Sequence, residues 1–337
     1  MTAREPLIAA FLEHAGWSGA RRARLAGDAS FRKYDRLVGA GGNAVLMDAP
    51  PPMENVQPFI RMARHLARLG LSAPRILAED VAHGLLLLED LGDATYTRLL
   101  AAGHDEDALY RLAVDVLIAI HARPATEAVP ADLPAYDDAR LLAEAALLVD
   151  WYLPALRGHP TPAEAVEAYR AVWARTLAVA RRVPDSLVLR DYHVDNLMLL
   201  EGRRGIAACG LLDFQDAVAG PIAYDFVSLV EDARRDIDPR RAASLRARYL
   251  AAFPALAPAD FDAATAVLGA QRHCKVIGIF TRLAVRDGKP DYLVHIPRVW
   301  RLLDRALAHP ALAAVRLWID REVPAETRIV PPGLARP

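Results

Sequence analysis

Apolar residues in the first ninety positions are spaced first as in a helix and then in alternation. Leu7, Ile8, Phe11 and Leu12 recur at intervals of three and four, which predicts a helix over 6–15. Glycines punctuate the alternating stretch that follows, as is typical of antiparallel strands joined by turns. The pattern predicts a second helix at 56–69 and strands at 31–38, 44–47, 75–79 and 84–89.

From residue 94 to residue 309 the apolar period is mainly helical. The predicted helices cover 94–102, 106–122, 138–152, 161–182, 223–233, 239–252 and long parts of 258–309. Two short apolar runs, 197–200 and 206–212, flank a Glu-Gly-Arg-Arg-Gly turn and predict a β-hairpin. We therefore expect an α+β chain, with a small antiparallel-sheet N-lobe at 1–89 and a larger, mainly helical C-lobe at 90–337.

Composition narrows the classes of partner. The 337 residues carry a formal net charge of −1, so no overall charge favours nucleic acid or an anionic membrane. Cys209 and Cys274 lie far apart and match no zinc-binding spacing, which favours ordinary thiols in a reducing compartment. No signal-peptide core is evident, and no apolar run approaches the ~20 residues of a membrane span. We expect a cytoplasmic protein with no obligatory protein partner evident.

The most informative pattern lies in residues 188–215. Asn196 follows Asp191 by five residues, and Asp213 follows the second strand of the predicted hairpin. Protein kinases carry D-x-x-x-x-N and then D-F-G, in which one aspartate serves the attacking hydroxyl and the other two side chains hold Mg²⁺. The start of one hairpin strand adjoins the end of its partner, so Asn196 and Asp213 can reach one ion. The spacing predicts kinase-like phosphoryl transfer, although Leu189 and Gln215 replace the usual His and Gly.

Two segments of the predicted N-lobe are candidates for holding ATP. The linker after the last strand offers backbone groups for adenine, so Glu89 and Leu91 are predicted contacts. The loop before Phe31 occupies the place of a kinase glycine-rich loop but has a single glycine, and its Ser30 hydroxyl can donate to phosphate. The strand at 44–47 lacks the usual phosphate-binding lysine. Arg32 or Lys33 is the candidate replacement, unless both belong to a solvated strand face.

These motifs resemble those of the aminoglycoside phosphotransferase-like, or choline-kinase-like, family of small-molecule kinases. Within that family the chain is most similar to bacterial anomeric sugar kinases that act on N-acetylmuramate and N-acetylglucosamine. The resemblance implies a two-lobed protein-kinase-like fold. It covers nearly the whole chain and rests on G-D-A-S-F-R-K-Y at 27–34, V-L-M-D-A-P-P at 45–51, L-x-L-E-D-L-G at 86–92, L-R-D-Y-H-V-D-N-L-M at 189–198 and L-L-D-F-Q-D-A-x-x-G-P-x-x-Y-D at 211–225.

The resemblance also implies a reaction, with ATP as co-substrate and Mg²⁺ as cofactor. The acceptor would be the anomeric (C1) hydroxyl of a small amino sugar, and the product a sugar 1-phosphate in peptidoglycan recycling. Asp191 would accept or orient the hydroxyl proton, while Asn196 and Asp213 would coordinate Mg²⁺ on the ATP phosphates.

Further polar residues lie beside the motif. His193 on the catalytic loop, and Gln215 and Asp216 after the predicted metal ligand, are candidate substrate contacts, or else they fix the turns on which they lie. Asp225 opens a helix after Gly220-Pro221, and we expect it to brace the catalytic loop rather than react.

Two other interpretations remain open. An aminoglycoside, choline or homoserine kinase would share the motif, but a polycationic aminoglycoside favours an acidic cleft. Residues 231–260 carry five acids and six arginines, and arginine suits an anionic substituent such as a lactyl carboxylate. A pseudokinase that binds without catalysis would explain the missing lysine. The intact Asp191, Asn196 and Asp213 argue against it.

Overall fold

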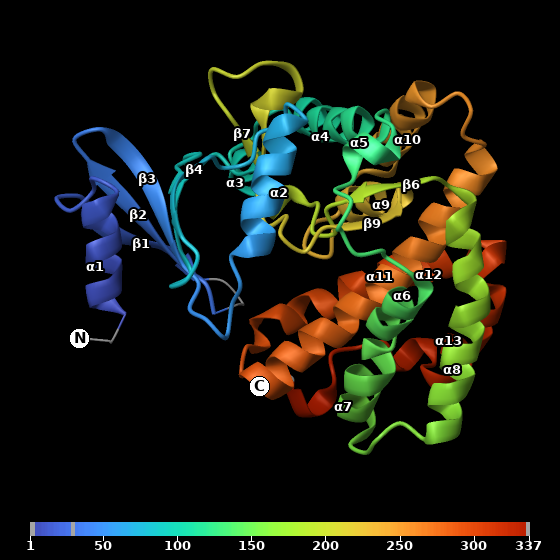
Figure 1. The fold of residues 1–337 in the computed structure, drawn as a ribbon. Coiled ribbons are helices and arrows are strands. Elements are labelled where there is room, and N and C mark those ends of the chain that lie inside the picture. Colours follow the sequence, from blue (N-terminus) through green and yellow to red (C-terminus); the bar gives the residue numbers. More distant parts are fainter. Residues whose placement is uncertain (1–3, 28–30, 335–337) are drawn as a thin grey trace. The chain divides into compact units, whose positions relative to one another are not determined.

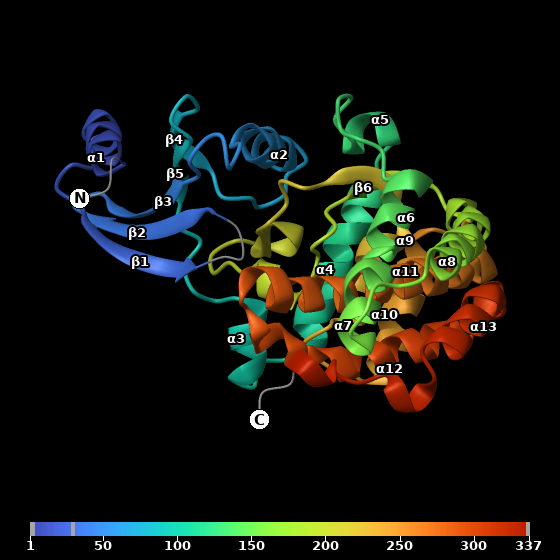
Figure 2. The same cartoon turned by 90° about the horizontal axis from the view of Figure 1, so that it is seen from below.

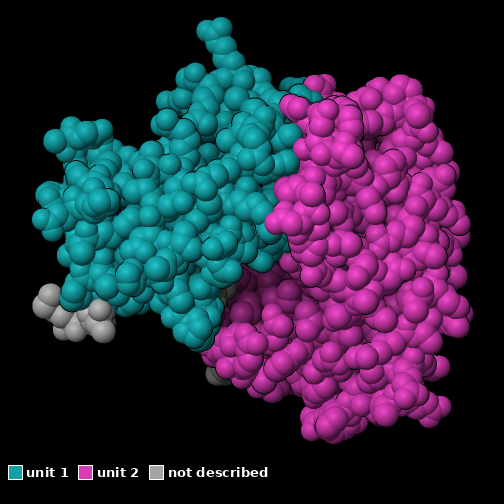
Figure 3. Space-filling view, viewed as in Figure 1, with its two compact units in different colours: residues 1–116, 194–217 teal, residues 117–193, 218–337 magenta. Residues whose placement is uncertain are grey.

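A computed structural model describes residues 4–27 and 31–334. These residues pack into two compact units, which Figure 3 colours separately. Unit 1 holds the residues up to 116 together with 194–217, and unit 2 holds 117–193 and the residues from 218 onward. Figures 1 and 2 show the sheet of unit 1 in blue and cyan and the long helices of unit 2 in green to red.

An antiparallel sheet organises unit 1. Its five described strands run in the order β1-β2-β3-β5-β4 and are β1 (Arg21–Gly27), β2 (Lys33–Gly39), β3 (Gly42–Asp48), β4 (Ile76–Asp80) and β5 (Leu85–Glu89). Helix α1 (Glu5–His14) buries Ile8, Phe11 and Leu12 against one face of this sheet. Successive strand residues point to opposite faces, so alternate residues of β3 and β5 form the partner surface. These residues are Ala44, Leu46, Leu85 and Leu87.

The opposite face of the sheet carries a second set of apolar side chains. Its side chains include Val45 and Leu88, which are directly opposite each other in the β3–β5 pair. Helix α2 (Gln57–Arg68) turns a buried, strongly apolar side to the interior of unit 1 and carries Phe59, whose ring lies 4.9 Å from that of Phe214. The short hairpin of β7 (Leu197–Leu199) and β8 (Cys209–Leu211) belongs to the same unit, where Ser72 forms a bridge to Gly210.

Helices make up most of unit 2. The described helices after the sheet are α3 (Tyr96–Ala101), α4 (Glu106–His121), α5 (Ala125–Ala128), α6 (Asp138–Ala145), α7 (Leu153–Arg157), α8 (Ala163–Thr176), α9 (Ala223–Val230), α10 (Pro239–Ala252), α11 (Pro258–Asp287), α12 (Ile296–Leu307) and α13 (Ala313–Glu322). Of these, α3 and most of α4 belong to unit 1. Helix α11 is buried along most of its length. A Cβ at Gly278 would lie 2.4 Å from the backbone of Leu147, so only glycine permits this close approach.

Most predicted elements are confirmed, and three need correction. The segment at 138–152 is not one helix, because α6 gives way to a π-helical turn at Leu148–Tyr152, next to the close approach of Gly278. The second hairpin strand begins at Cys209 rather than 206, since Gly205–Ala208 form a 3₁₀ turn whose Ala207 carbonyl accepts from the Ser72 hydroxyl. Strand β6 (Asp185–Val188) pairs with β9 (Val218–Pro221), a strand that the sequence analysis did not predict.

The boundaries of the two compact units do not coincide with the predicted boundary between the lobes. Residues 90–116 and 194–217 pack with unit 1, whereas the predicted lobe boundary lies at 89/90. That boundary stays a prediction, because kinase lobes are defined by function as well as by packing. Among the helices of 4–27 and 31–334, none is long and apolar enough to cross a bilayer.

Candidate active site

Asp191 lies on the loop that follows strand β6, and side chains of unit 2 form hydrogen bonds to the backbone of this loop. Both carboxylate oxygens of Asp225, at the start of α9, accept backbone N–H groups from this loop. The distances are 2.5 Å from Leu189 and 2.9 Å from Arg190. The Ser228 hydroxyl donates to the Arg190 carbonyl at 3.4 Å. The expected bracing by Asp225 is thus what the geometry shows.

The backbone and the electrostatics at this point are both unusual. Arg190 has a φ of 70°, a left-handed conformation that costs a non-glycine residue about 1–3 kcal/mol. Its guanidinium pairs with Glu144 of α6, which holds the side chain in place. Burial raises the pKa of Asp225 to about 7, against the opposing effect of its two backbone donors. Such strain and pKa shifts concentrate at functional sites.

In unit 1, Asn196 and Asp213 lie side by side at one end of the β7–β8 hairpin. Asn196 ends a 3₁₀ turn and Asp213 follows β8, and the Asn196 amide lies 3.4 Å from an Asp213 carboxylate oxygen. Asp213 has a φ of 56°, also in the left-handed region. Gln215 is buried and donates from its side-chain amide to the other Asp213 oxygen at 2.7 Å. The hairpin therefore joins the two predicted metal ligands.

A cavity of about 600 Å³ in unit 1 contains this pair. Apolar side chains of the sheet and α2, including Val45, Phe59 and Leu88, form one part of its wall. The predicted adenine linker, Glu89–Gly92, forms another part. The volume falls within the ~300–1,000 Å³ typical of ligand pockets. One pocket thus combines an apolar slot, exposed linker backbone and two oxygen ligands for a cation.

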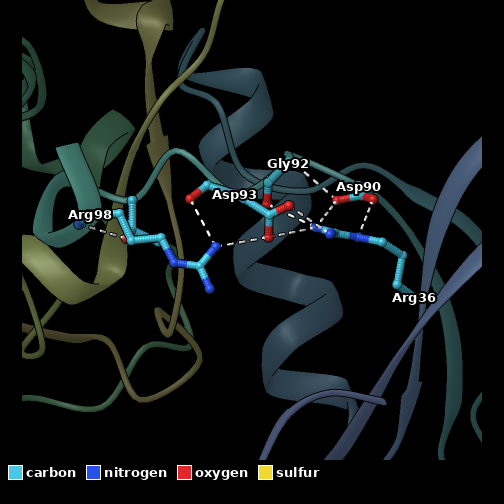
Figure 4. A network of polar contacts seen from close by, with 6 residues as sticks. Arg36, Asp90, Gly92, Asp93 and Arg98 are labelled. Atoms are coloured by element: carbon cyan, nitrogen blue, oxygen red, sulfur yellow. Dashed lines mark hydrogen bonds and ion pairs between the residues drawn. The ribbon is translucent and has the colours of Figure 1, made fainter. Parts of the chain in front are cut away.

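The linker is tied to the sheet by charged side chains. Figure 4 shows Arg36 reaching from β2 to the linker. Its guanidinium lies 2.7 Å from Asp90, donates to Asp93 at 2.7 Å and donates to the Gly92 carbonyl at 3.1 Å. Arg98 donates to the same Asp93 at 3.1 Å. This network was not predicted from the sequence. The available signal was an arginine on the face of β2 that points away from α1.

The cation proposed near the phosphates has a defined partner. Arg32 forms an ion pair with Glu54 at 3.0 Å, and their side chains are only 13% and 11% exposed. Burial lowers the pKa of Arg32, but nearby acidic groups, including Asp213 and Asp216, outweigh it and raise the pKa. Lys33 is exposed at the start of β2. Neither side chain lines the cavity, and the Ser30 prediction lies outside the described residues.

The remaining predicted residues have different surroundings. Glu89 lines the cavity, but its carboxylate is engaged by Arg75 at 3.2 Å and by Arg203 at 2.7 Å. Asp216 is exposed. His193 is buried in unit 2, where burial lowers the pKa of its ring.

A second, smaller cavity lies within unit 2 and is lined by Asp191 and His193. Its volume is about 100 Å³. The other charged lining residues are Arg234, Arg272 and Lys275. The last two come from α11, which the sequence analysis assigned no functional residue. A lysine inside an apolar helix of a chain with only three lysines was the signal that could have drawn attention to it.

The Asn196–Asp213 pair suits magnesium better than a transition metal. An amide and a carboxylate side by side offer hard oxygen ligands, and Mg²⁺ commonly takes one or two protein ligands with phosphates supplying others. A 180° flip of the Asn196 side-chain amide exchanges its oxygen and its nitrogen. The amide oxygen can therefore face a cation. In the described ranges, no group of three or more His, Cys, Asp or Glu side chains is arranged to hold a metal. The pair fits an ion shared with a nucleotide.

The amino-acid sequence is similar to those of known phosphotransferases. Residues 22–261 match the model of the phosphotransferase enzyme family. An N-acetylmuramate/N-acetylglucosamine kinase of Caulobacter vibrioides is 41% identical over 357 aligned positions, which cover 96% of this chain and 98% of that protein.

Solved structures of kinases share the fold. A putative aminoglycoside phosphotransferase of Ralstonia eutropha has a TM-score of 0.63 at 17% identity, covering 93% of this chain and 98% of that one. An ADP-bound aminoglycoside phosphotransferase has a TM-score of 0.59 at 16% identity, covering 90% and 98%. The predicted α+β, protein-kinase-like fold is confirmed. The chain belongs to the phosphotransferase enzyme family.

Proposed function

We propose that this protein transfers the γ-phosphoryl group of ATP to the anomeric hydroxyl of N-acetylmuramate and N-acetylglucosamine. The observation that carries the proposal is the full-length similarity to a kinase of that name in a chain that keeps Asp191, Asn196 and Asp213. A sugar 1-phosphate made in this way would serve salvage of cell-wall sugars in the cytoplasm.

In the proposed reaction the C1 oxygen attacks the γ-phosphorus of ATP. A new C1–O–P linkage forms, the bond between the γ-phosphorus and the β–γ bridging oxygen breaks, and ADP leaves. Asp191 orients the hydroxyl and takes its proton, and an anomeric hydroxyl is more acidic than other sugar hydroxyls. The brace from Asp225 to the loop fixes where the Asp191 carboxylate can lie. Positioning of this kind supplies most of the rate in phosphoryl transfer.

Mg²⁺, when bound, would neutralise charge that develops on the phosphate oxygens. Asn196 and Asp213 would hold it, and the Gln215 amide would keep the Asp213 carboxylate in one orientation by its 2.7 Å hydrogen bond. The adenine would occupy the apolar slot beside Glu89 and Leu91. Asp216 and His193 stay candidates for contacts to the acceptor.

Arg32 is our candidate for the phosphate-binding cation that β3 lacks. In protein kinases the corresponding lysine is held by a glutamate, and here Glu54 holds Arg32 at 3.0 Å in a largely buried pair. The fields of Asp213 and Asp216 act on the same guanidinium, so its charge is close to the metal ligands. Lys33 is exposed on the strand, and no carboxylate of residues 4–27 and 31–334 forms an ion pair with it. In this proposal, Arg32 held by Glu54 would take the place of the usual lysine.

The decisive experiment is an acceptor panel. ATP consumption is measured with N-acetylmuramate, N-acetylglucosamine, an aminoglycoside, choline and homoserine, with Mg²⁺ present and then removed by EDTA. We expect Mg²⁺-dependent turnover of the amino sugars and a ³¹P–¹H coupling that places phosphate on C1. Phosphate on another oxygen, or preference for choline, homoserine or an aminoglycoside, would overturn the proposal. Nucleotide binding without turnover of any acceptor would indicate a pseudokinase.

A further inference from the structure

The small cavity in unit 2 has an unusual charge for its degree of burial. Asp191 is the one carboxylate among its described lining residues, which also include Arg234, Arg272 and Lys275. Arg272 and Lys275 lie three positions apart on α11 and therefore share a face of the helix. They are 5% and 8% exposed. Arginine and lysine are almost never buried so deeply unless they are paired.

The two α11 cations differ in their pairing. The Lys275 ammonium lies 3.1 Å from Glu144 and 3.4 Å from the Tyr224 hydroxyl. Within the described ranges, the hydrogen bonding of Arg272 is limited to the Glu231 carbonyl at 3.5 Å, and no carboxylate pairs with it. A carbonyl does not neutralise a guanidinium. Arg272 therefore brings to the cavity wall a buried positive charge that has no carboxylate at ion-pair distance among the described residues, although it interacts over a longer distance with Asp225.

Other acidic groups lie near the cavity but do not line it. Asp225 holds the catalytic loop, and Glu231 pairs with His273 at 2.6 Å. Asp232 accepts the Arg234 backbone N–H through one oxygen and does not line the cavity. Its second oxygen is buried with no hydrogen-bond partner among the described residues. The described lining residues thus include three cations and one carboxylate, and burial lowers the pKa of the neighbouring His193 ring.

The size of the cavity limits what can occupy it. Its volume of about 100 Å³ equals roughly three water molecules at ~30 Å³ each. A whole amino sugar does not fit, whereas a substituent of a few heavy atoms does. Val276, Ile279 and Phe280 supply apolar wall beside the cations. The preferred occupant is therefore a small anionic group with a short apolar part.

We propose that the Arg272–Lys275 cavity binds the lactyl carboxylate of N-acetylmuramate and so sets the preference between the two acceptor sugars. This inference rests on the proposed function. The lactyl group is carried on C3, two ring atoms from the reacting C1, so a wall shared by Asp191 and Arg272 suits both groups. The lactyl methyl faces the apolar residues, and the carboxylate supplies a directly ion-paired partner for Arg272. N-acetylglucosamine has no such group and leaves the cavity to water.

The test compares the two sugars in the intact enzyme. Kinetic constants are measured for wild type, Arg272→Gln, Lys275→Met and the control Arg286→Gln, which removes an exposed arginine of the same helix. For Arg272→Gln we expect the ratio of kcat/KM for N-acetylmuramate to that for N-acetylglucosamine to fall about 10- to 100-fold, mainly through KM. This is the effect of one charge-assisted hydrogen bond. Lys275→Met should lower the ratio less, and Arg286→Gln should leave it unchanged.

A second measurement protects the test against a misfolded variant. Wild-type enzyme is assayed with N-acetylmuramate and with its neutral methyl ester, and the acid should be favoured by at least about 10-fold. An unchanged sugar ratio in Arg272→Gln, or equal use of acid and ester, would overturn the inference while the proposed function stands. Failure of wild type to phosphorylate either sugar would instead overturn the proposed function, and the inference with it.

Discussion

Replacement of Asp225 by asparagine tests whether the catalytic loop is held by a buried carboxylate. Asp225 is fully buried and accepts the N–H groups of Leu189 and Arg190 at 2.5 and 2.9 Å. Asparagine has the same shape, but only one of its two terminal atoms can accept. One loop N–H would lose its acceptor, and the left-handed Arg190 would lose part of its support.

The expected loss of activity follows from that one contact. A hydrogen bond to a charged group contributes about 1.5–3 kcal/mol, so kcat should fall about 10- to 100-fold if the loop must be fixed in the transition state. The KM for ATP should change little, because the cavity proposed for ATP lies within unit 1.

The pH dependence of stability gives a second, independent signature. Burial raises the pKa of Asp225 from an ordinary 3.8 to about 7, with the nearby Asp191 charge adding to the rise and Arg272 opposing it. The folded protein therefore binds a proton more tightly than the unfolded chain. The stabilisation is complete below about pH 4 and is lost as the pH rises toward 7. At about 1.4 kcal/mol per pH unit, wild type should lose about 2.5 kcal/mol relative to Asp225→Asn between pH 5 and pH 7.

Urea unfolding from pH 5 to pH 8 and steady-state kinetics measure the two effects. Asp238→Asn serves as the control, since Asp238 is an exposed helix cap and asparagine caps equally well. Its stability difference from wild type should not vary over this range, and its kcat should match that of wild type. A pH-independent difference for Asp225→Asn, together with wild-type kcat, would refute the bracing role.

Four further substitutions test the nucleotide-binding residues. Arg32→Met should raise the KM for ATP about 10-fold or more, because it removes the phosphate-binding charge. Glu54→Gln should also raise the KM for ATP. An unchanged KM in both variants would exclude the pair from phosphate binding. Asp213→Asn should raise the Mg²⁺ concentration for half-maximal activity about 10-fold or more, as measured by Mg²⁺ titration, and an unchanged titration would exclude Asp213 as a ligand. Arg36→Met should raise the KM for ATP about 3- to 10-fold with kcat nearly unchanged, because the linker loses its anchor to β2; a lowered kcat with normal KM would contradict that role.

The sequence predicted the parts of the site that depend on short-range geometry. Asn196 and Asp213 flank a hairpin, and the pairing of antiparallel strands brings them together without any knowledge of the rest of the fold. The brace by Asp225 was predicted for a similar reason, since a carboxylate at a helix start next to a loop usually accepts backbone N–H groups. Residue spacing carries this information.

Contacts between distant segments were not predictable in the same way. Arg32 and Glu54 are separated by 22 positions, and Glu54 lies before α2, so no helical pattern marked it as a partner. Arg272 and Lys275 are polar residues within an apolar helix, and the sequence does not show which face of α11 meets which neighbours. The π-helical turn at Leu148–Tyr152 likewise begins beside Leu147, whose backbone Gly278 of α11 approaches closely, and this contact joins distant segments.

Substitution of Asp191 tests the central claim most directly. Asp191→Asn is compared with Asp185→Asn, a control at the exposed start of strand β6, which precedes the Asp191 loop, by measuring kcat with N-acetylmuramate and the Kd for ATP. We predict that Asp191→Asn lowers kcat by at least about 100-fold, as loss of a general base does, with the Kd for ATP within about threefold of wild type. Activity close to that of wild type in Asp191→Asn would contradict the assignment of Asp191 as the residue that serves the acceptor hydroxyl.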